Sequence, residues 1–214
     1  MNGLRWGRKL SCLLLAMILL AGMTVVSAAT PSNSPIIRIG LMTKQFGILA
    51  SCNGGYQIVN VDDGKVLGEY PAGTKMRIGL REGKFVINNT VVASDRMRIE
   101  PQKTKSIERE DRLVEVNNRR YRGSVEIFRT QGAAGMTAVN VLTVDEYVYG
   151  VLGLTLTPEW PEQAVKAQAV VVRTFALHNI GKHRNEGFDL CDTGDCLVYE
   201  GQTQENPKIL KAIE

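Results

Sequence analysis

The chain has 214 residues and holds 26 Lys and Arg against 22 Asp and Glu, so its formal net charge is +4. Three of the basic residues and none of the acidic ones lie within residues 1–29, so the remainder carries a net charge of only +1. This balance gives no support for the basic surface that nucleic-acid binding requires, and we expect no nucleic-acid partner. Residues 30–214 are long enough for one domain of ordinary size or two small ones.

Residues 1–29 have the layout of a secretory signal peptide, with a basic start, an apolar run and a small-residue exit. These parts are Arg5, Arg8 and Lys9, the 17 residues of 10–26, and Ser27-Ala28-Ala29. The apolar run is shorter than the roughly 20 residues of a spanning helix, and an uncleaved anchor is the alternative. In either case we expect the rest of the chain to be extracytoplasmic, secreted or anchored through this segment alone.

Residues 30–112 are predicted to form a β-rich N-terminal region. After a polar linker at 30–35, short β-prone runs alternate with turns that contain Gly, Pro or Asp. The runs are residues 36–42, 56–61, 65–70, 75–80 and 84–89. Residues 94–112 are charged and show little apolar periodicity, so we interpret them as a solvated connector or an exposed edge.

Residues 113–214 are predicted to be a mixed α/β region, which makes the chain α+β. Runs at 113–118, 124–129 and 136–142 are typical of strands. A capping box follows, in which the side chains of Thr143 and Glu146 bind each other's free backbone N–H groups, and it predicts a helix from Val144 to about Val151.

A second helix is predicted to begin near Pro161, which suits the first helical turn. Its apolar residues fall on every side, and we therefore expect a buried central helix. Trp160 and Phe175 are predicted to anchor it in the core, with sugar stacking as the alternative role. Polar side chains on a buried helix need partners or a cleft. Lys166, Gln168 and Arg173 are therefore candidate substrate-binding residues, and the alternative for Arg173 is a structural ion pair with a carboxylate such as Glu146.

Three cysteines remain after residue 29, and two of them lie close together in the sequence. Cys191 and Cys196 flank a polar turn that would let them form a disulfide bond. A zinc site is the alternative, with His183, Asp192 or Asp195 as further ligands, and free thiols are the third reading. The sequence requires no cofactor, and zinc is the one metal that it suggests. A nucleophilic triad lacks support because neither His178 nor His183 has a Ser or Cys motif beside it.

The stretch 144–173, VDEYVYGVLGLTLTPEWPEQAVKAQAVVVR, resembles the stage II sporulation protein D (SpoIID/LytB) family. The residues that match the family pattern are Glu146, Tyr147, Gly150, Val151, Trp160, Pro161, Ala164, Lys166, Ala167, Gln168, Ala169, Val170, Arg173 and Thr174. Tyr121-Arg122-Gly123 also reproduces a family element. Some family members are understood to hold zinc near the loop that contains Cys191 and Cys196.

The resemblance implies an exported protein that acts on peptidoglycan glycan strands. Enzymatic members are lytic transglycosylases, in which one carboxylic acid protonates the leaving oxygen and then, as a carboxylate, accepts the proton of the muramic C6 hydroxyl. Such an acid needs a pKa raised toward neutrality. Thr155 occupies the position of the family glutamate, so we expect activity to be impaired. Glu159 is the nearest carboxylate in the same loop and the candidate substitute.

Other family members are amidase enhancers, which stimulate a partner hydrolase. A non-catalytic enhancer or a cell-wall-binding accessory protein is therefore the alternative function, and another cell-wall hydrolase is the expected partner. Residues 207–214 show a rising amphipathic pattern, so we expect the chain to end within a helix. Because family members continue through a segment that contains Ser-Gly-Gly, we expect the region 113–214 to be incomplete at its C-terminus.

Overall fold

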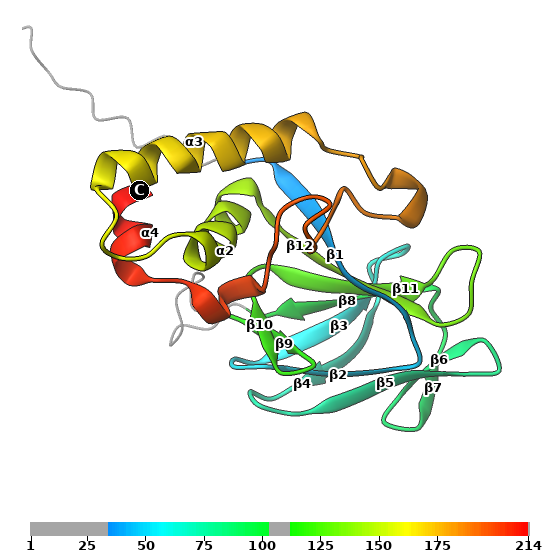
Figure 1. Cartoon of the computed structure of the whole chain (residues 1–214). Coiled ribbons are helices and arrows are strands. Elements are labelled where there is room, and N and C mark those ends of the chain that lie inside the picture. The colour runs from blue at the N-terminus through cyan, green and yellow to red at the C-terminus, as the bar shows by residue number, and fades with distance from the viewer. Residues whose placement is uncertain (1–33, 103–111, 214) are drawn as a thin grey trace, which may run out of the picture. The chain divides into compact units, whose positions relative to one another are not determined.

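The computed structural model describes residues 34–102 and 112–213 (Figure 1). The predicted signal peptide or anchor at 1–29 lies outside the described residues. Among the helices of the described ranges, none combines the length and hydropathy that crossing a membrane requires.

The fold is α+β, as predicted. In the described part of the chain, strands form one sheet of seven and one of six. The seven-stranded sheet runs in the order β13 (Leu190–Cys191), β1 (Ile36–Gln45), β12 (Met136–Thr143), β11 (Ser124–Arg129), β8 (Arg96–Pro101), β3 (Tyr56–Asn60) and β4 (Val66–Tyr70). The six-stranded sheet runs β10 (Arg119–Tyr121), β9 (Val114–Val116), β2 (Gly47–Cys52), β5 (Met76–Arg81), β6 (Lys84–Ile87) and β7 (Thr90–Val92).

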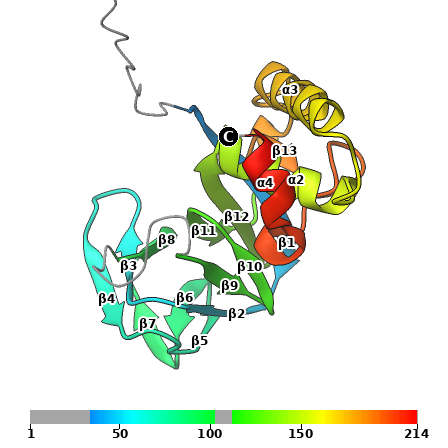
Figure 2. The ribbon, with the colours of Figure 1, turned by 90° about the vertical axis from the view of Figure 1, so that its left-hand side faces the viewer.

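The two sheets enclose a common hydrophobic core. Only Phe46 separates β1 from β2, so the chain passes almost directly from one sheet into the other (Figure 2). Alternate side chains of both sheets face the same cluster, including Ile39 of β1, Ile48 of β2 and Ile58 of β3. Both of the predicted regions, 30–112 and 113–214, contribute strands to each sheet.

Most of the predicted strands are confirmed, and two of their turns follow directly from paired asparagines. Asn88 and Asn89 have φ of 47° and 73°, and Asn117 and Asn118 have φ of 47° and 67°. Two successive residues with positive φ are what a type I′ hairpin requires, and Asn tolerates this conformation better than most residues. The asparagines therefore fix the hairpins β6–β7 and β9–β10.

The interpretation of residues 94–112 as a connector or an exposed edge was wrong for 96–101. These residues form β8, which lies inside the sheet between β11 and β3. Met97 and Ile99 are fully buried, and they alternate with Arg96, Arg98 and Glu100 on the opposite face. The period-2 pattern of a strand is thus present, although its polar half consists of charged residues.

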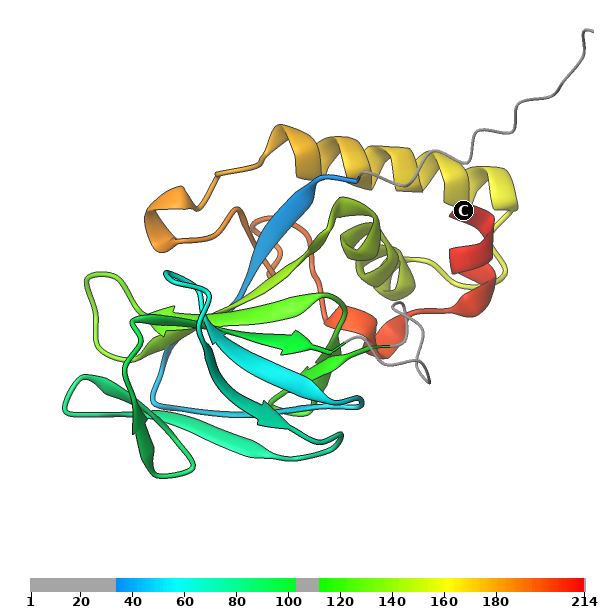
Figure 3. The same cartoon turned by 180° about the vertical axis from the view of Figure 1, so that it is seen from behind.

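Three α-helices of the described residues gather beside β12 and β1: α2 (Val144–Thr155), α3 (Glu162–His178) and α4 (Pro207–Ile213) (Figures 1 and 3). The predicted capping box is confirmed, since Thr143 Oγ1 accepts from the backbone N–H of Glu146 at 3.2 Å, and Glu146 Oε2 accepts from that of Thr143 at 2.8 Å. The helix extends one turn beyond the predicted end.

The prediction of a buried central helix was wrong in part. Helix α3 buries a single stripe, which consists of Val165, Ala169, Val172 and Ala176. Its other face leaves Val170 and Val171 almost 60% exposed. Trp160, predicted to anchor this helix in the core, is 47% exposed, whereas Phe175 packs against the core as expected. Apolar composition alone did not show that only one side of this helix meets the rest of the fold.

Candidate functional site

Thr155, which the sequence resemblance aligns with the family's glutamate, is the last residue of α2 and has an exposed side chain. Its Oγ1 donates a hydrogen bond to the carbonyl of Val151, one turn earlier, at 3.0 Å. The hydroxyl thus closes the final turn of the helix. Thr155 therefore has no carboxyl group that could act as a general acid at this position.

Glu159, the candidate substitute acid, lies in the loop between α2 and α3 and is exposed. A hydrogen bond with the Thr157 side chain lowers the pKa of the Glu159 carboxyl below its usual value. Glu159 is therefore ionised at neutral pH. A general acid needs the opposite shift, which burial beside apolar groups produces.

The predicted substrate-binding residues of α3 do not converge on one cleft. The Lys166 ammonium pairs with Glu162 at 2.7 Å on the exposed side of the helix. Arg173 binds Asp145 Oδ1 through Nε and Nη2 at 3.0 and 2.7 Å, and so ties α3 to the first turn of α2. The structural ion pair that was one of the two readings for Arg173 is thus present, with Asp145 rather than Glu146 as the carboxylate. Gln168 is half-buried.

A compact cluster of metal-ligating side chains lies in the loop after α3. His183, Cys191, Asp195 and Cys196 each direct one donor atom to a region in which all four atoms lie within 4.8 Å of one another. Nε2 of His183 lies 3.4 Å from Sγ of Cys196 and 3.2 Å from a carboxylate oxygen of Asp195. Cys191 and Cys196 are both free thiols.

The distances between these donor atoms are compatible with a zinc ion held by four ligands. Zinc bonds of about 2.3 Å to sulfur and 2.0 Å to nitrogen place such ligand atoms roughly 3.6 Å apart, close to the distance between His183 and Cys196. Two thiols, one imidazole and one carboxylate form a donor set that zinc accepts. Four protein ligands would close the coordination sphere, which is typical of a structural site.

Contacts with neighbouring groups affect His183 and Cys191, two of the candidate metal ligands. Nδ1 of His183 lies 2.8 Å from Glu186 Oε1, which leaves Nε2 facing the sulfur. This contact raises the pKa of His183. Burial raises the pKa of the Cys191 thiol, but hydrogen bonds with Thr193 and Cys196 and the nearby imidazole of His183 together outweigh it, so the net effect is a lowered pKa.

Phe188 fixes the ring of His183 against the seven-stranded sheet. The two rings stack with their centroids 5.3 Å apart, and Phe188 is buried with Phe128 and Val139 on the outer face of that sheet. The loop also bonds to β1, because Arg38 donates from Nη2 to the carbonyl of Gly187 and from its backbone N–H to Asp189. The cluster is therefore built on a sheet edge.

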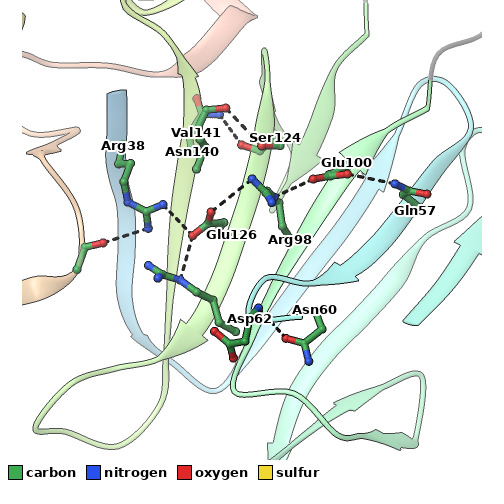
Figure 4. A network of polar contacts seen from close by, with 12 residues as sticks. Arg38, Gln57, Asn60, Asp62, Arg98, Glu100, Ser124, Glu126, Asn140 and Val141 are labelled. Atoms are coloured by element: carbon green, nitrogen blue, oxygen red, sulfur yellow. Dashed lines mark hydrogen bonds and ion pairs between the residues drawn. The ribbon is translucent and has the colours of Figure 1, made fainter. Parts of the chain in front are cut away.

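Arg38 is itself held by a buried carboxylate (Figure 4). Glu126 of β11 is 3% exposed, and its Oε2 lies 2.8 Å from Nη1 of Arg38 and 3.0 Å from Nε of Arg96. Arg98 lies 3.9 Å from the other carboxylate oxygen and pairs with Glu100 at 2.8 Å. Three guanidinium groups thus surround one carboxylate, a network that sequence analysis missed because its members lie on three different strands.

The Tyr-Arg-Gly element at 121–123 joins the sheets to the segment before α4. Arg122 binds Glu205 through two hydrogen bonds of 2.8 and 2.5 Å, and both side chains are at least 90% buried. The backbone carbonyl of Arg122 accepts from Asn140, whose Oδ1 accepts in turn from the hydroxyl of Tyr199 at 2.8 Å.

Comparison with known proteins identifies this region. The family model described as SpoIID, stage II sporulation protein, matches residues 132–214. Residues 132–214 belong to the SpoIID family. An uncharacterized protein of Brachyspira hyodysenteriae is 40% identical over 80 residues, which cover 37% of this chain and 22% of that protein. The aligned part is thus about a fifth of the relative's length. No solved structure matches the chain.

The SpoIID segment contains every candidate site residue that the sequence suggested, from Thr155 to Cys196. The structure brings the proposed metal ligands together, but it separates Arg173 and Lys166, which bind different carboxylates. Asp195, weighed from sequence only as one of several further ligands, belongs to the cluster, whereas Asp192 lies outside it.

Proposed function

We propose that this protein is an exported, peptidoglycan-directed member of the SpoIID lineage with little or no transglycosylase activity. The observation that carries the proposal is Thr155 at the end of α2, where enzymatic members place the glutamate. Loss of general acid catalysis costs about two to four orders of magnitude in rate. The hydroxyl of Thr155 cannot replace a carboxylic acid in this reaction.

Glu159 does not restore the missing acid. Its carboxyl is exposed and its pKa is lowered, so almost none of it carries a proton at neutral pH. A carboxylate in that state cannot protonate a leaving oxygen. Proposed export rests on the signal-like residues 1–29, and the proposed substrate class rests on membership of the SpoIID family.

An accessory role is the second candidate, in which the protein binds the wall and stimulates an amidase. It is favoured by the combination of a kept scaffold and a lost acid. The capping box fixes the start of α2, and the Arg173–Asp145 pair ties α3 to α2. A chain that retains this framework without the acid suits binding better than cleavage.

We further propose that His183, Cys191, Asp195 and Cys196 hold a structural zinc ion. The ion would cross-link the segment after α3, where the chain has little regular secondary structure. With four protein ligands it would leave no open position for a substrate. Its contribution is therefore to folding, because metal binding to a folded site stabilises that fold.

Sedimentation with insoluble peptidoglycan tests the proposed function. Purified protein is mixed with isolated sacculi, and the bound fraction is measured together with the release of soluble fragments. We expect binding without release. In parallel, a cell-wall amidase is assayed with and without the protein, and stimulation supports the accessory role. A protein that stays in the supernatant and leaves amidase activity unchanged contradicts the proposal.

A further inference from the structure

We propose that a hollow on the outer face of the six-stranded sheet binds a small phosphate monoester. The hollow has a volume of about 380 Å³, which lies within the range of small-molecule pockets. Its lining includes Arg77, Gly79 and Arg81 of β5 and Val86 of β6. These residues precede the SpoIID segment 132–214, so the inference is independent of the proposed function.

Gly79 forms the floor of the hollow. Side chains alternate along a strand, so Arg77, Gly79 and Arg81 share the face of β5 opposite to its buried residues. Gly47 of β2 and Val86 of β6 are the strand partners of Gly79 on its two sides. The two glycines leave this part of the sheet without side chains, and Val86 makes the adjoining surface apolar.

The fold itself does not require glycine at positions 47 and 79. Neither residue has a positive φ, and β2 pairs with β5 without a bulge. A Cβ at Gly47 would meet no atom within 4 Å, and one at Gly79 would meet only the carbonyl oxygen of Phe46 at 3.5 Å, which is an ordinary contact. Glycine inside a strand weakens it and often marks a place where a ligand approaches the backbone closely. We therefore interpret Gly79 as the point where a ligand lies against the sheet.

Two guanidinium groups flank this floor without a counter-charge. Arg77 and Arg81 are exposed, and neither forms an ion pair with any residue that the structure describes. Lys84 lies directly opposite Arg81 across the β5–β6 hairpin, and Glu82 in the turn between them forms an ion pair with neither. Like charges in such a cross-strand pair are destabilising. An anionic ligand in the hollow would offset this repulsion.

The charge of the hollow matches a phosphate monoester better than a carboxylate. A phosphate monoester carries about 1.5 to 2 negative charges at pH 7 and three acceptor oxygens, whereas a carboxylate carries a single charge. A planar guanidinium donates two parallel hydrogen bonds to such oxygens. The Cα atoms of Arg77 and Arg81 are about 13 Å apart along the strand, a span that two arginine side chains can close from both ends. One phosphate group would then lie over Gly79, with the rest of the molecule against Val86.

Three probes with the same pyranose ring test the inference by calorimetric titration of the purified protein. Glucose 6-phosphate carries a phosphate monoester, glucuronate carries a carboxylate at the same carbon, and glucose carries no charge. We expect glucose 6-phosphate to bind about tenfold more tightly than glucuronate, and glucose not to bind. The affinity for glucose 6-phosphate should fall as salt is raised, because salt screens the attraction between the charges.

Charge variants assign the contacts with the phosphate. Arg77→Gln and Arg81→Gln should each weaken the binding of glucose 6-phosphate about tenfold, because each removes charge-assisted hydrogen bonds. Lys65→Gln is the matched control, since Lys65 is an exposed basic residue between β3 and β4, outside the hollow. This control removes one positive charge as well and should leave the affinity unchanged.

Gly79→Val fills the hollow and separates binding from stability. Valine is favoured in strands, and a Cβ at this position meets only an ordinary contact, so the melting temperature should stay the same or rise. The binding of glucose 6-phosphate should nevertheless be lost, because the valine side chain occupies the space above the floor. Thermal unfolding and calorimetry of the same preparation provide the two readouts.

Three results would overturn the inference. The first is an unmodified protein that does not bind glucose 6-phosphate, or that binds glucuronate equally well. The second is binding that Gly79→Val leaves intact, which would place the ligand elsewhere. The third is a loss of affinity in Lys65→Gln as large as that in Arg77→Gln, which would show that overall charge and not the hollow attracts the phosphate.

Discussion

Sγ of Cys196 lies 3.4 Å from Nε2 of His183, although the two residues are thirteen positions apart in the sequence. The turn between Cys191 and Cys196 brings the thiols together, and the stacking of His183 on Phe188 directs the imidazole toward them. This convergence supports the zinc site that we propose for His183, Cys191, Asp195 and Cys196.

The first prediction is that the purified protein binds about one zinc ion per chain. Removal of zinc by a chelator should lower the melting temperature, because the ion binds only the folded loop. Cys196→Ser should abolish most zinc binding, whereas Cys52→Ala should retain it, since Cys52 is buried in β2 away from the cluster. Metal analysis and thermal unfolding provide the two readouts. A metal-free protein whose melting temperature ignores both zinc and chelator contradicts the site.

The buried pair of Arg122 and Glu205 gives a second prediction. Arg122→Ala leaves a buried carboxylate without its partner and should lower the free energy of unfolding by about 3–5 kcal/mol. The double change Arg122→Met and Glu205→Leu removes both charges and should cost far less than Arg122→Ala alone. Chemical denaturation of the three proteins checks this order. If the double variant is the least stable of the three, this prediction is contradicted, and the two side chains stabilise the fold through more than the pairing of their charges.

A third prediction concerns Glu126. Glu126→Gln removes the carboxylate that Arg38, Arg96 and Arg98 surround, so the guanidinium groups repel one another at the same site. We expect a loss of about 3 kcal/mol in stability at low salt, and part of it should return in high salt through screening. Because Arg38 also bonds to Gly187, zinc affinity should fall as well. Unchanged zinc affinity would show that the sheet and the loop are independent.

The fourth prediction is that the ion pair of Arg173 and Asp145 contributes less to the free energy of unfolding than the buried pairs do. Both side chains are about one third exposed, and partly solvated pairs contribute roughly 1 kcal/mol or less. We therefore expect Arg173→Gln to lower stability by about that amount, and Lys166→Gln, on the fully exposed side, to have almost no effect. Urea denaturation compares the two. A large effect of Arg173→Gln on sacculus binding, with little change in stability, would instead make Arg173 a ligand contact.

The sequence predicted those structural elements that are determined by residues close together in the chain. Thr143 and Glu146 form the capping box three residues apart, and the paired asparagines close their hairpins without help from distant residues. Strand β8 was missed because Arg96 and Arg98 read as a solvated charge run. Their partner Glu126 comes from β11, and only strand pairing reveals that these charges neutralise one another.

The candidate site likewise combines features set by nearby residues, which the sequence predicted, with features set by distant ones, which it did not. Thr155 and the two cysteines were identified from sequence because each is a departure from, or a part of, a short motif. The exposure of Trp160 was not predictable, because it depends on α3 presenting one stripe to the core and on where α4 lies. The convergence of His183 and Asp195 depends on the path of the loop between them.

The central proposal, that this protein with its SpoIID segment lacks transglycosylase activity, is tested most directly by digesting purified peptidoglycan and analysing the products by mass for 1,6-anhydro-muropeptides. We expect none above the level of a protein-free control. Thr155→Glu, which returns the carboxylate to the end of α2, is the informative companion variant, and any anhydro product should come from it alone. Robust release of anhydro-muropeptides by the unmodified chain, abolished by Glu159→Gln, would contradict the account and make Glu159 the catalytic acid.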